Sequence, residues 1–93
     1  MSANWFDEHL RSLLVDCSFD YSSFPNGDFG FLERVEVEGG GKLATVDVWS
    51  QGWVGFDIYD CVLNEQVMNI LISPDEKDAV PETIEKFVEI MRG

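Results

Sequence analysis

The stretch that decides the fold is VDVWSQGWVGFDIYD, from Val46 to Asp60. Two runs of alternating apolar and other residues flank a Ser-Gln-Gly segment, a pattern typical of strands with one buried face. A three-residue loop at 50–52 makes every inward pair apolar: Val48 with Val54, Val46 with Phe56, and Ala44 with Ile58. Gly52 then occupies the position where such a loop needs a left-handed residue. The stretch therefore predicts an antiparallel hairpin.

The same register places aromatic and acidic residues together on the opposite face of the hairpin. A helix packed over this face would bury the carboxylates, which is costly without partners. Arg34 can pair with Asp47, but the sequence offers no evident partner for Asp57. Because Trp and Tyr are frequent at binding hot spots, we interpret this face as exposed and partner-binding. The candidate binding residues are Asp47, Trp49, Trp53, Asp57 and Tyr59.

Further strands extend this hairpin on both sides. FLERVEVE (31–38) precedes a turn at Gly40-Gly41, and the resulting pairs are Val37 with Ala44, Val35 with Val46, Arg34 with Asp47, and Leu32 with Trp49. Phe19, Tyr21 and Phe24 predict a short edge strand before it. QVMNILIS (66–73) predicts a strand after it, with either Met68, Ile70 and Ile72 or Val67 and Leu71 facing inward.

Helical patterns lie at the two ends of the chain. NWFDEHLRSLLVD (4–16) predicts an amphipathic helix capped by Ser2 or Asn4, with Asp7 and Glu8 in its first turn. The segment from Ser73 to Glu76 matches a capping box and predicts a short helical turn. A last helix is expected from Pro81, and one apolar stripe runs along it: Val80, Ile84, Phe87, Val88 and Met91.

These elements predict a single α+β domain over residues 1–93. Its expected order is an N-terminal helix, an antiparallel β-meander of four to five strands and a C-terminal helix. An antiparallel sheet commonly leaves one face to solvent, so we expect both helices on one face.

The composition is globular but strongly acidic, with 18 Asp and Glu against 6 Lys and Arg and a net charge of −12. Such a surface repels nucleic acid and anionic lipid and attracts basic partners. The N-terminus resembles no signal peptide, and no apolar run is long enough to span a membrane. We therefore expect a cytoplasmic protein in which Cys17 and Cys61 are reduced and mostly packed.

The sequence shows no constellation of residues that predicts catalysis. His9 belongs to no recognised motif, and the two cysteines match no zinc spacing. The acidic segments lack the spacing of a calcium loop, and the three glycines at 39–41 lack a phosphate-loop pattern. We expect a protein that is not an enzyme and needs no metal or cofactor.

Three segments together resemble small immunity proteins of bacterial polymorphic-toxin and contact-dependent inhibition systems, in particular the TriTu family. They are WFDEHLRSLL (5–14), LATVDVWSQGWVGFDIYD (43–60) and ETIEKFVEIM (82–91). The resemblance implies tight, non-catalytic binding of a cognate protein toxin, which the acidic charge suggests is basic, such as a nuclease. Only Trp49, in the VDVW stretch, is carried over from the family pattern.

Two alternatives stay open at the level of the sequence. A phage-encoded acidic inhibitor, such as an anti-CRISPR protein or nucleic-acid mimic, would also be strongly acidic, although a mimic needs little aromatic surface. A homodimeric structural domain would bury the aromatic face against a second copy.

Overall fold

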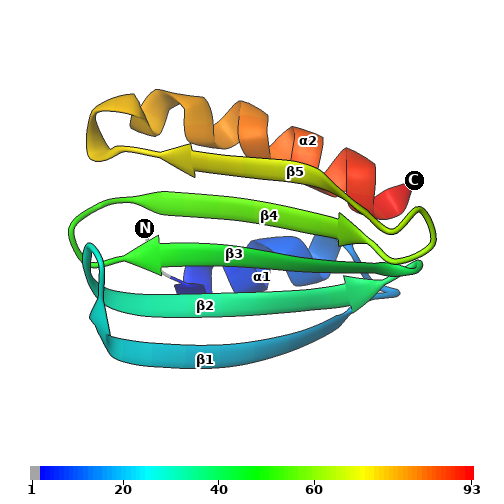
Figure 1. Ribbon diagram of the computed structural model, residues 1–93, viewed down its shortest axis with the longest axis horizontal. Coiled ribbons are helices and arrows are strands. Elements are labelled where there is room, and N and C mark those ends of the chain that lie inside the picture. Colours follow the sequence, from blue (N-terminus) through cyan, green and yellow to red (C-terminus); the bar gives the residue numbers. More distant parts are fainter. Residues whose placement is uncertain (1–2) are drawn as a thin grey trace.

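The computed structural model describes residues 3–93, and Figure 1 shows a five-stranded antiparallel sheet with helices at both ends of the chain. The strands neighbour one another in chain order, so the predicted α+β meander is confirmed. The elements are α1 (Ala3–Leu13), β1 (Ser18–Gly27), β2 (Gly30–Gly39), β3 (Lys42–Trp49), β4 (Val54–Asp60), β5 (Glu65–Ile72), the 3-10 helix η1 (Pro74–Ala79) and α2 (Val80–Arg92).

The predicted registers of the two central hairpins are confirmed. Val37 faces Ala44 and Arg34 faces Asp47 across β2 and β3. Across β3 and β4, Val46 faces Phe56. Gly52 has a φ of +97°, as the three-residue loop requires. A one-residue slip would have moved every apolar side chain to the opposite face, which explains why the pattern alone determines the pairing.

The last strand takes the first of its two predicted orientations. Met68 and Ile72 are buried, whereas Leu71 is exposed on the other face. Ile58 pairs with Met68 and Tyr59 pairs with Gln66, so Val67 is an extra residue in β5. This bulge accounts for the ambiguous alternation at the start of the strand.

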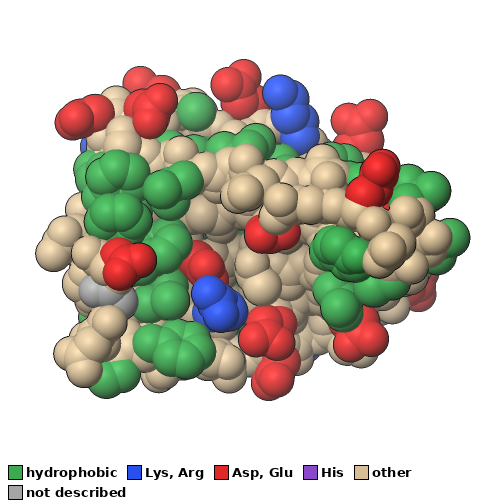
Figure 2. Space-filling model, viewed as in Figure 1, with side chains coloured by type: hydrophobic (Ala, Val, Ile, Leu, Met, Phe, Trp, Pro, Cys, Tyr) green, Lys and Arg blue, Asp and Glu red, His purple; other side chains and the backbone are tan. Residues whose placement is uncertain are grey.

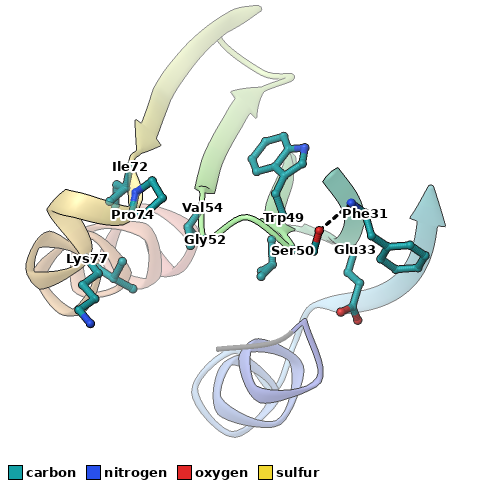
Figure 3. Close-up of a pocket in the computed structure, with 11 residues that line it drawn as sticks. Phe31, Glu33, Trp49, Ser50, Gly52, Val54, Ile72, Pro74 and Lys77 are labelled. Atoms are coloured by element: carbon teal, nitrogen blue, oxygen red, sulfur yellow. Dashed lines mark hydrogen bonds between the residues drawn. The ribbon is translucent and has the colours of Figure 1, made fainter. Parts of the chain in front are cut away.

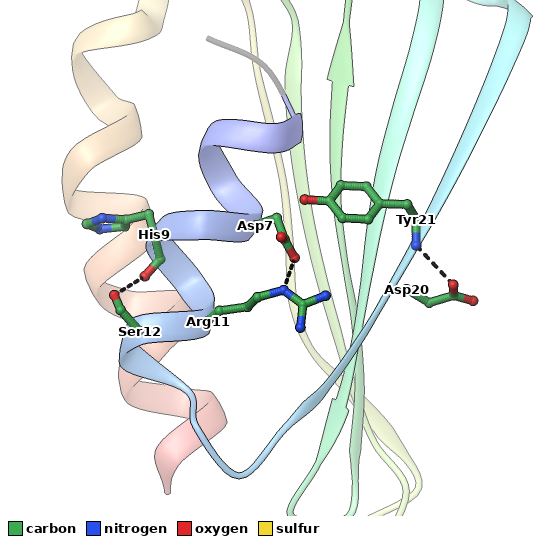
Figure 4. A network of polar contacts seen from close by, with 6 residues as sticks. All are labelled: Asp7, His9, Arg11, Ser12, Asp20 and Tyr21. Carbon is green, nitrogen blue, oxygen red and sulfur yellow. Dashed lines mark hydrogen bonds and ion pairs between the residues drawn. The ribbon is translucent and has the colours of Figure 1, made fainter.

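Both helices contact the same phenylalanine of the sheet. The ring of Phe56 in β4 lies 5.9 Å from the ring of Phe6 in α1 and 5.8 Å from that of Phe87 in α2, centroid to centroid. Figure 4 shows the two helices side by side on one side of the strands. We call this side of the sheet the inner face and the opposite side the outer face. The apolar residues of the inner face and of the helix stripes form one continuous core.

The first helix differs from its prediction at both ends. It ends at Leu13 rather than near Asp16, and its first turn contains no acidic residue. Arg92 of α2 donates to the carbonyl oxygen of Leu13 from Nε and a terminal nitrogen, at 3.2 and 3.0 Å. The carbonyl at the end of α1 thus finds its donor at the other end of the chain, and the sequence around α1 does not predict this partner. Ser2 lies outside the described residues, and Asn4 lies within the helix instead of capping it.

The C-terminal part follows its prediction closely. The Glu76 carboxylate accepts hydrogen bonds from the backbone N–H and the hydroxyl of Ser73, at 3.3 and 2.9 Å. The predicted short helical turn is η1, and α2 begins at Val80, one residue before Pro81. The five stripe residues of α2 are buried, together with Thr83.

Candidate protein-binding site

The outer face is the candidate site, because neither helix is drawn over it in the view of Figure 1, and Figure 2 shows it directly. Hydrophobic side chains gather at its two ends, and charged side chains lie between them (Figure 2). The strand registers place five acidic residues at outer positions: Asp20, Glu36, Glu38, Asp47 and Asp57. Arg34 is the one basic residue at an outer position of the described strands.

An aromatic cluster of Phe29, Trp49 and Trp53 occupies one end of the outer face. The Phe29 ring stacks on Trp53 at 4.2 Å between centroids and meets Trp49 edge-on at 5.4 Å. All three side chains are half-buried. The two tryptophans are therefore less open than the sequence suggested, because Phe29 from the β1–β2 turn covers part of both.

The loop between β3 and β4 holds Phe29 in this position. Ser50 exchanges two hydrogen bonds with Phe31: its N–H donates to the Phe31 carbonyl and its Oγ accepts from the Phe31 N–H, both at 2.8 Å (Figure 3). The N–H of Gln51 donates to the carbonyl of Phe29 at 3.2 Å. A hollow of about 460 Å³ with largely apolar walls lies between this loop and η1 (Figure 3). These three hydrogen bonds join the β3–β4 loop to the turn that carries Phe29.

An ion pair occupies the centre of the outer face. Arg34 Nε lies 2.7 Å from one oxygen of Asp47, and a terminal nitrogen lies 3.0 Å from the other. The hydrogen bond to Asp47 raises the pKa of the Arg34 guanidinium above its ordinary value, so it stays charged. Beside the pair, the Trp49 ring lies over Gly55, where a β-carbon would come within 3.3 Å of the indole. The absence of a side chain at Gly55 therefore lets the indole approach the strand backbone closely.

An acidic depression of about 440 Å³ lies toward the other end of the outer face. Its lining includes Asp20, Glu36, Glu38 and Asp57, together with Leu43 and Tyr59. Asp20 lies directly opposite Glu36, an arrangement that destabilises a sheet when nothing neutralises it.

Two acids of this depression have hydrogen-bonding partners that the sequence did not reveal. Asp57 accepts a hydrogen bond from Gln66 at 2.9 Å, which answers the question of its partner. The Asp20 carboxylate accepts one from the backbone N–H of Tyr21 at 3.0 Å (Figure 4). Both donors are neutral, and the charge of Arg34 also interacts with Glu36 and Asp57.

The residues considered for catalysis lie on separate elements: His9 on α1, Cys17 in the α1–β1 connection and Cys61 in the β4–β5 loop. His9 is exposed on α1 and stacks on Trp5 at 5.0 Å. Within residues 3–93, no three His, Cys, Asp or Glu side chains are grouped to hold a metal ion. Both cysteines are free thiols. Cys17 is half-buried, but Cys61 is exposed, so the expectation that both are packed is wrong for Cys61.

The two thiols should differ in reactivity. Burial, reinforced by the negative charge of Asp16, raises the pKa of the Cys17 thiol and lowers its thiolate fraction near pH 8. We expect an aromatic disulfide reagent to label Cys61 at least about tenfold faster than Cys17 in the folded protein. Stopped-flow absorbance of the Cys17→Ser and Cys61→Ser variants measures each rate separately. Equal rates in the two variants would contradict the assigned burial.

Comparison with known proteins adds no relationship: no family model, no curated protein and no solved structure matches the chain. None of the helices in residues 3–93 has the length and apolar character needed to cross a membrane.

Sequence reasoning missed two groups of surface residues. Phe29 was assigned no role, although it completes the aromatic cluster. Val62 and Leu63, at the β4–β5 turn, are among the most exposed apolar residues of the protein. The available signal was the apolar sequence Cys-Val-Leu between two strands, where polar turn residues are usual.

Proposed function

We propose that the protein is an immunity protein that binds a basic protein toxin through the outer face and neutralises it without catalysis. In this proposal it acts in the cytoplasm, where free thiols persist. The five predicted contact residues are all at outer positions or beside them, and the aromatic cluster and the acidic depression extend the same surface.

The single observation that carries the proposal is the cluster of carboxylates that lines the depression on the outer face. Asp20 and Glu36 face each other across β1 and β2, an arrangement that is unfavourable when nothing neutralises it, and the hydrogen-bond donors to Asp20 and Asp57 are neutral. A partner that brings Lys or Arg to this surface would relieve the repulsion and be steered toward it. Aromatic side chains on the same face supply contact area at low entropic cost.

Co-expression with the protein encoded immediately upstream of this chain tests the proposal. The upstream protein alone should stop growth of the host, and this chain should restore growth and co-elute with the toxin. A catalytically inactive toxin variant is the control for co-elution without selection. Absence of both growth rescue and a complex would rule out the immunity function.

The aromatic cluster gives a second prediction. Trp53→Ala should weaken toxin binding by more than about 1 kcal/mol, because it removes a hot-spot side chain. The fold should survive, since Trp53 is half-buried and packs on Phe29 outside the core. Trp5→Ala is the matched control, because Trp5 lies on α1 and packs on Phe6 and His9. Calorimetric titration and thermal melting separate the two effects: collapse of the fold would place Trp53 in a structural role.

A further inference from the structure

The β4–β5 loop displays apolar side chains to solvent. Val62 is 81% exposed and Leu63 is 62% exposed, at the tip of the loop. Leu43 and Tyr59, which face each other at the adjoining ends of β3 and β4, are exposed as well. We call these four residues the loop-end patch: the β4–β5 loop that carries Val62 and Leu63 follows the end of β4 where Tyr59 pairs with Leu43. Figure 2 shows hydrophobic side chains at this end of the molecule.

Four hydrogen bonds organise the loop that carries the patch. The carboxylate of Asp60, which is only 8% exposed, accepts hydrogen bonds from the N–H groups of Val62 and Leu63 at 2.9 and 3.0 Å. The N–H of Cys61 donates to the carbonyl of Gly41 at 2.8 Å, which joins this loop to the β2–β3 turn. The Tyr59 hydroxyl donates to the side-chain oxygen of Asn64.

A loop that is already ordered by hydrogen bonds favours binding. Its exposed apolar side chains, in contrast, are unfavourable in a protein that has no partner to cover them. The ordering entropy has already been lost on folding, so little more is lost when a partner covers the tip. Val62 lies close over the second glycine of the β2–β3 turn: a β-carbon at Gly41 would come within 2.9 Å of Val62 Cγ2. The two turns therefore support each other and present Val62 and Leu63 outward.

Charge identifies the kind of partner that fits. Leu43 and Tyr59 belong both to the loop-end patch and to the lining of the acidic depression, so carboxylates border the apolar surface. A second copy of this chain, with its net charge of −12, would bring like charges together at that border. A basic protein with an apolar pocket rimmed by Lys or Arg complements both features.

We propose that the loop-end patch is the anchor of the interface, with Val62 and Leu63 entering an apolar pocket on the basic toxin. This inference rests on the proposed function and assigns part of the binding energy to this end of the outer face. Interfaces commonly concentrate their energy in a few side chains that become fully desolvated.

The test compares the double variant Val62→Ser/Leu63→Ser with the control Val15→Ser. Val15 is equally apolar and 79% exposed, but it lies in the connection between α1 and β1. The probe is the inactive form of the upstream-encoded protein, and Kd is measured by calorimetry. We expect the double variant to bind at least about tenfold more weakly and Val15→Ser to change Kd by less than about twofold. Unchanged urea midpoints would exclude unfolding as the cause.

The possible failures are distinguishable. If the wild-type protein binds the probe and the double variant binds equally well, the anchor is elsewhere and the proposed function stands. If the wild-type protein does not bind, the proposed function fails and this inference fails with it. If light scattering finds a wild-type dimer that the double variant abolishes, the patch binds a second copy, which also overturns the inference.

Discussion

Replacing Phe56 by alanine should lower the free energy of unfolding by about 3–5 kcal/mol, the usual cost of removing a buried phenylalanine. The Phe56 ring is 2% exposed and contacts Phe6 of α1 and Phe87 of α2. Truncation leaves a cavity at the point where both helices meet the sheet. Since domains of this size are stable by about 5–15 kcal/mol, a large part of the stability would be lost.

Urea denaturation measured by tryptophan fluorescence and circular dichroism tests this result. Phe24→Ala is the matched control, because the Phe24 side chain is exposed at an outer position of β1 and packs against Arg34. The control should cost less than about 1.5 kcal/mol, because little apolar area is buried there. Similar losses in the two variants would show that Phe56 does not join the helices to the sheet.

Reversing two charges of the acidic depression should slow toxin association at low salt by about tenfold or more. The double variant Glu36→Lys/Asp57→Lys removes two of its carboxylates and adds two cations. Long-range attraction between the two proteins then falls before they make contact. The effect should shrink at about 0.5 M salt, where screening shortens the range of the interaction to a few ångströms.

Stopped-flow association with the upstream-encoded protein at several salt concentrations provides the measurement. Glu82→Lys/Glu85→Lys is the matched control, because it changes the net charge equally on exposed positions of α2. If the control slows association as much as the outer-face variant, net charge alone governs the encounter and the depression has no special role.

The hairpin registers could be predicted from the sequence because they depend on neighbouring residues. Alternation of apolar side chains, together with Gly40, Gly41 and Gly52, leaves one pairing in which Val35, Val37, Ala44, Val46, Phe56 and Ile58 all share the inner face. The end of α1 could not be predicted in this way. Arg92 reaches the Leu13 carbonyl from 79 residues away, and the helical periodicity of the sequence continues past the point where the helix stops.

The candidate site was predictable only in part, for the same physical reason. The register places Asp47, Trp49, Asp57 and Tyr59 on one face without any knowledge of the tertiary structure. The position of Phe29 depends on hydrogen bonds between two loops, and the exposure of Val62 and Leu63 depends on Asp60. Contacts of this kind produce no periodic pattern in the sequence, so they could not be predicted from it.

The central claim is that the outer face binds a basic partner, and methyl NMR of the complex tests it most directly. Leu43 and Leu71 are exposed on the outer face, whereas Leu13 is half-buried on α1 and Val15 is exposed in the α1–β1 connection. Addition of the inactive upstream-encoded protein should shift the methyl resonances of Leu43 and Leu71 and leave those of Leu13 and Val15 unchanged. Shifts confined to Leu13 and Val15 would place the partner on the helices and contradict the account.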